Sequence, residues 1–335
     1  MIIRLWKPLL LTTALSLLGT SWSPADDPEE VRVEQTRFAP GTVTVIPPAP
    51  QPDETFTGPI SLRDLIEAHP EIEWSAPDFP DGKPFFDART RTLREMAQQV
   101  ILRREVYCFE FAFKPLRQMY IDIPQSNGSL QRKLIWYMVY RVRYAGGDLR
   151  PSTAADSTKA VDRLYSRVEK VSYETRRFFP MVVLVDHETK AQYVDRILPA
   201  ALDRIQVREK ITAKLHNSVE MTQIPIPRSA DPSADGVWGV LTWEDVEPQT
   251  DFLSLYVYGL SNAFQRVTSE ENPSAKPVLI RKALQLNFYR PGDSIGETDD
   301  RIRFGIPAFE SEEEQAYVLK QYGLEKRLDY QWVYR

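Results

Sequence analysis

Aromatic and aliphatic residues that repeat with a period of two dominate the middle of the chain. Three phenylalanines at alternate positions share one face of residues 108–113, and residues 134–144 form a longer run of the same character. Between these runs, Asn127 and Gly128 form the dipeptide typical of a tight hairpin turn. Such alternation is typical of β-strands. We therefore predict that residues 134–144 form a central strand of a sheet, with Trp136 in the core.

The remaining strand-like runs cluster along the chain and do not alternate regularly with helices. They cover residues 119–123, 178–185, 191–194, 237–243, 252–258, 283–289, 301–304 and 330–334. Helical spacing or capping patterns predict helices at about residues 61–69, 88–104, 157–172, 199–215 and 312–322. This order argues against a doubly wound α/β fold. It predicts a mainly β protein, α+β by content, built as a sandwich with helical insertions.

Several of these strand-like runs form an ordered series between about residues 105 and 260. After the phenylalanines of residues 109–113 come an aromatic strand at 136–142 and a Pro-flanked apolar strand at 179–184. A strand that begins with Gly239 and a run at 255–257 complete the series. Over about residues 105–260 the chain resembles the immunoglobulin-like sandwich modules of exported bacterial proteins. The resemblance implies a module that binds, spaces or scaffolds, and it implies no catalytic residues. Insertions at about 145–177 and 196–235 depart from the compact form of that module.

The first 25 residues have the layout of a secretory signal peptide. Arg4 and Lys7 form a positive region, and residues 9–18 form an apolar region shorter than a membrane span. Ser23 and Ala25 then provide the small residues of a cleavage site. We therefore expect a periplasmic or secreted protein whose mature chain begins near Asp26 and carries no transmembrane segment.

Residues 26–88 are expected to be a linker that is mostly disordered. The segment is rich in proline and contains 4 Lys or Arg against 14 Asp or Glu, a net charge of −10. One apolar island at residues 41–46 is suited to an edge strand. Residues 89–306 then form the sandwich, and residues 307–335 form a C-terminal helix and an edge strand. The alternative of two sandwiches, divided near residues 226–236, stays open.

Charge is distributed unevenly along the chain. Residues 89–216 contain 24 Lys or Arg against 14 Asp or Glu, a net charge of +10. Residues 217–335 contain 12 Lys or Arg against 19 Asp or Glu, a net charge of −7. Exposed charges of this kind are ordinary on a soluble surface, although a basic middle region also suits an anionic ligand or the acidic linker. Nothing in the pattern indicates a nucleic-acid partner.

Motifs for catalysis and for transition metals are missing or incomplete. The single cysteine, Cys108, lies in an apolar run and excludes an intramolecular disulfide. The three histidines have no metal-type spacing. A Gly-x-Ser-x-Gly sequence at residues 292–296 lacks the strand–serine–helix context and the later histidine that hydrolases need. Nearby, Asp293, Glu297, Asp299 and Asp300 offer hard oxygen ligands, and calcium is the cation that such a set would take.

Two groups of residues remain as candidates for function. Trp243, Tyr256 and Tyr258 lie on aromatic strands and are candidates for a ligand-binding face. Carboxylates at residues 244–251 are the second group, since paired carboxylates serve glycoside hydrolysis. The sequence thus favours a non-catalytic envelope protein that binds or scaffolds a protein or glycan partner, without a cofactor other than calcium. The alternative is an extracytoplasmic hydrolase of polysaccharide or peptidoglycan.

Overall fold

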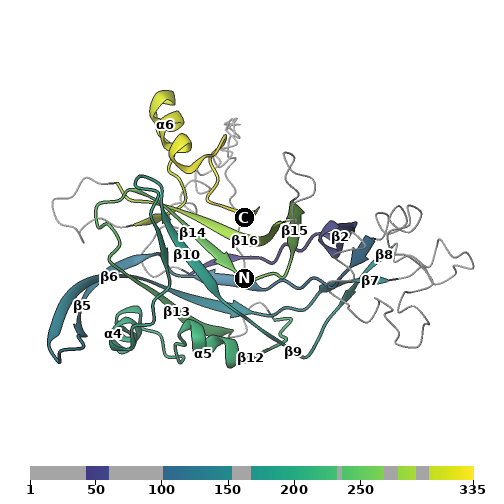
Figure 1. Cartoon of the computed structure of the whole chain (residues 1–335), viewed down its shortest axis with the longest axis horizontal. Coiled ribbons are helices and arrows are strands. Elements are labelled where there is room, and N and C mark those ends of the chain that lie inside the picture. The colour runs from purple at the N-terminus through teal and green to yellow at the C-terminus, as the bar shows by residue number, and fades with distance from the viewer. Residues whose placement is uncertain (1–42, 60–100, 153–166, 232–235, 268–277, 292–301) are drawn as a thin grey trace, which may run out of the picture.

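The computed structural model describes residues 43–59, 101–152, 167–231, 236–267, 278–291 and 302–335 (Figure 1). Its strands are β1 Thr44–Ile46, β2 Phe56–Pro59, β3 Ile101–Arg103, β4 Glu110–Phe113, β5 Arg117–Pro124, β6 Leu130–Arg143, β7 Asp148–Ser152, β8 Arg167–Val171, β9 Thr175–Arg177, β10 Met181–Asp186, β11 Gln192–Val194, β12 Pro225–Pro227, β13 Val237–Glu244, β14 Phe252–Tyr258, β15 Phe264–Val267, β16 Val278–Tyr289, β17 Arg303–Phe304 and β18 Tyr330–Tyr334. The helices are the 3-10 helix η1 Pro52–Thr55, α4 Pro199–Glu209, α5 Ser218–Gln223 and α6 Glu312–Tyr322. The protein is mainly β, as the sequence predicts.

The first sheet is built around β6, the long aromatic strand. β13 pairs along one edge of β6, while β4 and β5 share the other edge at its two ends. β1 adds to the free side of β4. The central position predicted for residues 134–144 is thus confirmed. Gly128, with φ of +82°, lies in the turn of the β5–β6 hairpin, where a positive φ favours glycine.

The second sheet has the order β11-β10-β14-β16. β16 is its longest strand and also pairs with β15, β17 and β18. All of these pairs are antiparallel, and β18 is the edge strand predicted at the end of the chain. The helix before β18 is also confirmed: Ser311 accepts a hydrogen bond from the Glu314 backbone, and Gly323 ends α6 in the left-handed region.

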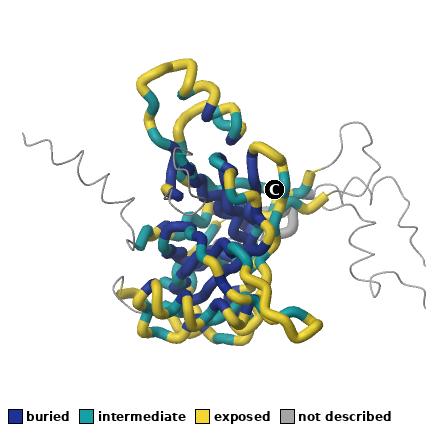
Figure 2. The backbone as a smooth tube through the Cα atoms, turned by 90° about the vertical axis from the view of Figure 1, so that its left-hand side faces the viewer, coloured by how far each residue is buried: buried dark blue, intermediate teal, exposed yellow. Residues whose placement is uncertain are grey.

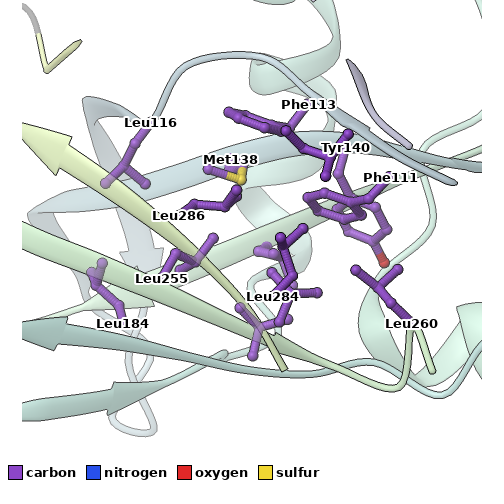
Figure 3. Close-up of a cluster of buried hydrophobic side chains, with 14 of the residues drawn as sticks. Phe111, Phe113, Leu116, Met138, Tyr140, Leu184, Leu255, Leu260, Leu284 and Leu286 are labelled. Atoms are coloured by element: carbon purple, nitrogen blue, oxygen red, sulfur yellow. The ribbon is translucent and has the colours of Figure 1, made fainter. Parts of the chain in front are cut away.

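The two sheets enclose one aromatic core. Alternate residues of both sheets meet in a single buried cluster, and burial is concentrated between the layers (Figures 2 and 3). Trp136 is fully buried there, as predicted, and it lies directly opposite Trp243 across β6 and β13. Since β13 pairs with β6, and β14 with β10, strands from both sides of residues 226–236 build both sheets. The described strands therefore form one core and not two.

The helix α4 covers the outer face of the first sheet. Its Ala201 and Ile205 pack against Tyr137 and Val139 of β6. Glu209, at the end of the helix, is buried and accepts a hydrogen bond of 2.7 Å from the Tyr137 hydroxyl. The helix is shorter than the predicted 199–215. It ends at Glu209 because the next residue adopts the left-handed conformation, with φ of +53°.

Part of the predicted disordered linker is packed on the body. β1 forms the edge strand expected from the apolar island, with Ile46 only 1% exposed. Glu54 is buried against the Lys282 ammonium of β16, and the Tyr334 hydroxyl donates to the same carboxylate at 2.7 Å. The expectation of disorder is therefore wrong for residues 43–59, because a buried ion pair and a strand pairing offset the low apolar content of this segment.

Two predicted helices contain strands. Ile101–Arg103, within the predicted helix 88–104, pairs with β2 as β3. Arg167–Val171, within the predicted helix 157–172, pairs with β7 as β8. In both places, pairing with a strand that is distant in sequence replaces the local helical spacing. Residues 88–100 and 157–166 of these two helices, the helix at 61–69 and the signal peptide lie outside the described residues.

Candidate functional site

The two candidate tyrosines lie together on the outer face of the second sheet, the face turned away from the core. Tyr256 lies opposite Val183 of β10, and Tyr258 lies opposite Met181. Val194 of β11 is opposite Val183 on the same face. Less than a tenth of each tyrosine is exposed, whereas Met181 is 46% and Val194 is 69% exposed. We call these five residues the outer tyrosine face.

Arg335 borders this face. Its guanidinium carbon lies 4.3 Å from the centre of the Tyr256 ring, a cation–π distance. Burial raises the pKa of Tyr256 above its usual value, although the charge of Arg335 acts in the opposite direction. The phenol therefore remains neutral at physiological pH. The outer tyrosine face is apolar, with a cation at its border.

Trp243 does not belong to this face. It lies on β13 of the first sheet and points into the core, where none of its surface is exposed. The period of two correctly predicts that one of the two tryptophans of β13 faces inward, and it is Trp243 rather than the partly exposed Trp238. Trp243 is therefore a core residue, and the prediction that it contacts a ligand is wrong.

A chain of polar side chains crosses the same outer face beside the tyrosines. The His187 Nε2 atom lies 2.7 Å from the Ser254 hydroxyl, which donates to Asn287 Oδ1 at 2.8 Å. Gln285 donates to the same Asn287 oxygen at 2.9 Å and accepts a bond of 2.9 Å from Gln331. We call these five residues the buried polar chain, since Ser254 and Asn287 are fully buried.

The direction of the hydrogen bonds decides what this chain does chemically. The Asn287 amide nitrogen donates to the Leu328 carbonyl at 2.7 Å, so its oxygen is the acceptor for Ser254. Because the Ser254 proton points to Asn287, His187 Nε2 carries a proton and donates to the Ser254 oxygen. A catalytic histidine must instead accept the proton of its serine. The pair therefore links strands and does not form a nucleophile.

The helix α6 covers the histidine end of the buried polar chain. The ring of Tyr322 lies 5.0 Å from the ring of His187. Burial lowers the pKa of His187 to about 4, and the nearby Lys190 acts in the same direction. The imidazole is thus neutral at physiological pH, which is consistent with its place in a closed network.

The carboxylates beside Trp243 are held by neighbouring groups. Glu244 lies 3.4 Å from the Lys133 ammonium and 3.2 Å from the Arg196 guanidinium. Glu247 accepts a hydrogen bond of 3.4 Å from the Gln249 backbone. The acidic residues of 293–300, which the hydrolase alternative would place in the same cleft, lie outside the described residues.

One further carboxylate, Asp195, has a perturbed pKa. It follows β11 and accepts a hydrogen bond of 2.9 Å from the Thr242 backbone of β13, so it joins the two sheets. Burial raises the pKa of Asp195 to about 6, although the bond from Thr242 acts in the opposite direction. The sequence offers no signal for this burial, because Asp195 follows a short and exposed strand.

The structure neither supports nor tests a metal site at the predicted calcium ligands. Asp293, Glu297, Asp299 and Asp300 all lie outside the described residues, so calcium binding there stays a prediction. Within the described ranges, no group of three or more His, Cys, Asp or Glu is arranged to hold a metal ion. Cys108 is buried, and burial raises the pKa of its thiol to about 12, as expected for an inert cysteine.

Comparison with protein-family models, with curated proteins and with solved structures finds no match to this chain. No helix among the described residues is both long and apolar enough to cross a membrane.

The sequence contains a signal for the buried polar chain. Ser254 interrupts the apolar run of β14, and Gln285 and Asn287 alternate with leucines in β16. Polar residues at every second position of an otherwise apolar strand mark the face turned away from the core. The same rule places Tyr256 and Tyr258 on that face, because both share the parity of Ser254.

Proposed function

We propose that this chain is an exported, non-catalytic module of the cell envelope that binds a protein partner through the outer tyrosine face. The observation that carries the proposal is the contrast between the two halves of this sheet face. The polar half is closed into the buried polar chain, whereas the apolar half leaves Met181 and Val194 open to solvent. Exposed apolar groups that are contiguous mark interaction surfaces more often than isolated ones do.

An immunoglobulin-like sandwich is part of this proposal, and the order of the strands supports it. The first sheet contains β4, β6 and β13 in that order, and the second contains β11, β10, β14 and β16. The three strands of the first sheet correspond in this order to strands A, B and E of an immunoglobulin domain. The four strands of the second sheet correspond in order to strands C′, C, F and G. On this assignment Trp136 belongs to strand B, and not to the strand C that carries the tryptophan of antibody domains.

A protein partner fits the exposed part of the face better than a glycan. Sugar rings stack on open aromatic rings, and both tyrosines are largely covered. What remains exposed is the aliphatic and thioether surface of Val194 and Met181, with the Arg335 cation nearby. Such a surface suits apolar side chains with an acidic group at their border.

Site-specific photo-crosslinking in the producing cell tests this function. A photoreactive phenylalanine analogue at position 194 or 181 should give one discrete crosslinked species, whose partner is identified by mass spectrometry. Val207 of α4 is the matched control, because it is 78% exposed but lies on the other sheet's side of the molecule. Equal crosslinking from all three positions, or none from 194 and 181, would contradict the proposal.

Export is tested separately. The mature protein should be recovered outside the cytoplasm with an N-terminus near Asp26, as the cleavage pattern of Ser23 and Ala25 predicts. Recovery of the intact N-terminus in the cytoplasm would contradict it. Binding of peptidoglycan by the purified mature chain, lost in Val194→Asp but kept in Val207→Asp, would favour a glycan partner instead.

A further inference from the structure

We propose that two copies of this chain pair through the free edge of β18 and form one continuous sheet. β18 is the last strand on its side of the second sheet and pairs only with β16 among the described strands. Its five residues are Tyr330, Gln331, Trp332, Val333 and Tyr334, with neither proline nor charge. An edge strand of this composition is a template for pairing with another strand. This inference does not rest on the binding role proposed above.

The hydrogen bonds of β18 show which backbone groups face outward. Arg335 and Arg281 exchange two backbone bonds of 3.0 Å, and Asp329 accepts one of 2.9 Å from Asn287. In an antiparallel ladder the bonded residues alternate. The backbone groups of Tyr330, Trp332 and Tyr334 therefore point away from β16.

The edge is complementary to itself. In the proposed register, Trp332 of one copy lies opposite Trp332 of the second copy. Tyr330 of each copy then lies opposite Tyr334 of the other. All outward backbone groups of β18 then meet outward groups of the other copy. The same register places Asp329 opposite Arg335 at both ends of the paired strands. Opposite charges at paired positions stabilise such a register.

Exposed apolar residues lie beyond one end of β18. Val278 and Leu279, at the start of β16 beyond the last residue of β18, are 63% and 55% exposed. In the antiparallel pairing the chain that leads into β18 of the other copy passes beside them. These two residues therefore extend the contact beyond the strand itself.

The oligomeric state of the mature chain tests the proposal. Sedimentation velocity over a hundredfold range of concentration should show a reversible monomer–dimer equilibrium. In Tyr330→Pro the dimer should be lost, because proline removes an outward N–H without breaking a bond to β16. Tyr330→Thr is the matched control, since it keeps the N–H and a strand-forming side chain, and it should still dimerise. Far-ultraviolet circular dichroism and the thermal midpoint establish that Tyr330→Pro is folded.

A crosslinking experiment fixes the register and does not depend on the proline variant. Gln331 of one copy lies opposite Val333 of the other in the proposed pairing. An oxidised mixture of Gln331→Cys and Val333→Cys chains should therefore give disulfide-linked heterodimers, and each variant alone should give far fewer. A chain that is monomeric throughout, a dimer that survives Tyr330→Pro, or efficient linking of either variant alone would overturn the proposal. So would a monomer that takes up a foreign extended peptide at this edge.

Discussion

At the scale of single residues, burial separates residues that bear chemistry from those that only resemble a site. Ser254 and His187 are within hydrogen-bond distance, as in a hydrolase. Yet the Ser254 hydroxyl donates to Asn287 and not to His187, and Ser254 is completely buried, so it is not a nucleophile. Trp243 and Tyr256 are both aromatic strand residues, yet only Tyr256 lies on an outer face. In each case the side chain's neighbours, and not its type, decide its role.

His187 should make the protein less stable in acid. Its pKa is about 4 in the folded state against 6.5 for an ordinary histidine, so the unfolded chain binds the extra proton first. Stability from the neutral imidazole is therefore complete above pH 6.5 and is lost as the pH falls toward 4. The loss amounts to about 3 kcal/mol at roughly 1.4 kcal/mol per pKa unit. Urea unfolding of the wild type at pH 7.5 and 4.5 measures it.

His187→Gln is the matched variant for that experiment, because glutamine keeps a donor for Ser254 but does not titrate. Between pH 7.5 and 4.5 the free energy of unfolding of the variant should fall less than that of the wild type. The difference should be most of the loss of about 3 kcal/mol expected for His187. Identical pH dependence in the two proteins would show that His187 is not the group responsible.

Asp195 should have the opposite effect on the pH dependence. Its pKa of about 6 exceeds the ordinary 3.8, so the folded state holds the proton more tightly than the unfolded chain. Stability from this group is greatest below pH 3.8 and decreases as the pH rises through 6. Asp195→Asn keeps an acceptor for Thr242 without the charge, so it should raise the free energy of unfolding at pH 8 by up to about 3 kcal/mol. The prediction is contradicted if the difference in free energy of unfolding between Asp195→Asn and the wild type is no larger at pH 8 than at pH 4.

Trp136 should be among the most sensitive positions for stability. It is fully buried between the sheets, and truncation of a buried aromatic side chain costs about 3–5 kcal/mol. Trp136→Ala should therefore lower the denaturation midpoint strongly or abolish folding. Tyr317→Ala is the control, since Tyr317 is 55% exposed on α6, and it should change the free energy of unfolding by less than about 1 kcal/mol. Equal stabilities of the two variants would place Trp136 outside the core.

At the scale of elements, the sequence predicts best where the pattern is long and the neighbours are local. The strand at 134–144 and the helix at 312–322 were predictable from period and capping alone. β8 was not, because its strand state depends on pairing with β7 and its own spacing resembles a helix. The period of two divides each strand into two faces, and the polar residues of β14 and β16 then indicate which face is turned outward. The pattern says nothing of ligand contact. Of the three candidate aromatic residues, Tyr256 and Tyr258 lie on an outer face and Trp243 is buried in the core.

The segment that contains β1 and η1 should be resistant to proteolysis and required for full stability. Glu54 and Lys282 form a buried ion pair, and removal of one partner leaves a buried charge, which typically costs about 3–5 kcal/mol. Lys282→Met should therefore destabilise the protein and speed cleavage by Glu-specific protease within residues 43–59. The exposed pair Arg150–Glu169 is the control, and Arg150→Met should have little effect. Rapid cleavage of the wild type in this segment would contradict the packing of η1.

At the scale of the whole molecule, shared sheets make the two halves of the sequence dependent on each other. β6 and β10 come from the first half, whereas their partners β13 and β14 come from the second. All four strands contribute to the same core cluster. A chain divided near residues 226–236 thus leaves each half with exposed strand edges and half a core. Contacts between segments distant in sequence, rather than any local pattern, decide this, so the question of one or two sandwiches could not be answered from the sequence.

This interdependence predicts a single cooperative unfolding transition. Tryptophan fluorescence, which reports on Trp136 and Trp243 in the core, and far-ultraviolet circular dichroism should give coincident urea curves. Two fragments, residues 43–231 and 232–335, should each lack a cooperative transition when purified alone, because neither contains a complete sheet. When they are refolded together, the transition should return, since β13 and β14 then find β6 and β10. A cooperative transition in either fragment alone would mean that it forms a core without the other, and the single core inferred from the strand pairing would be wrong.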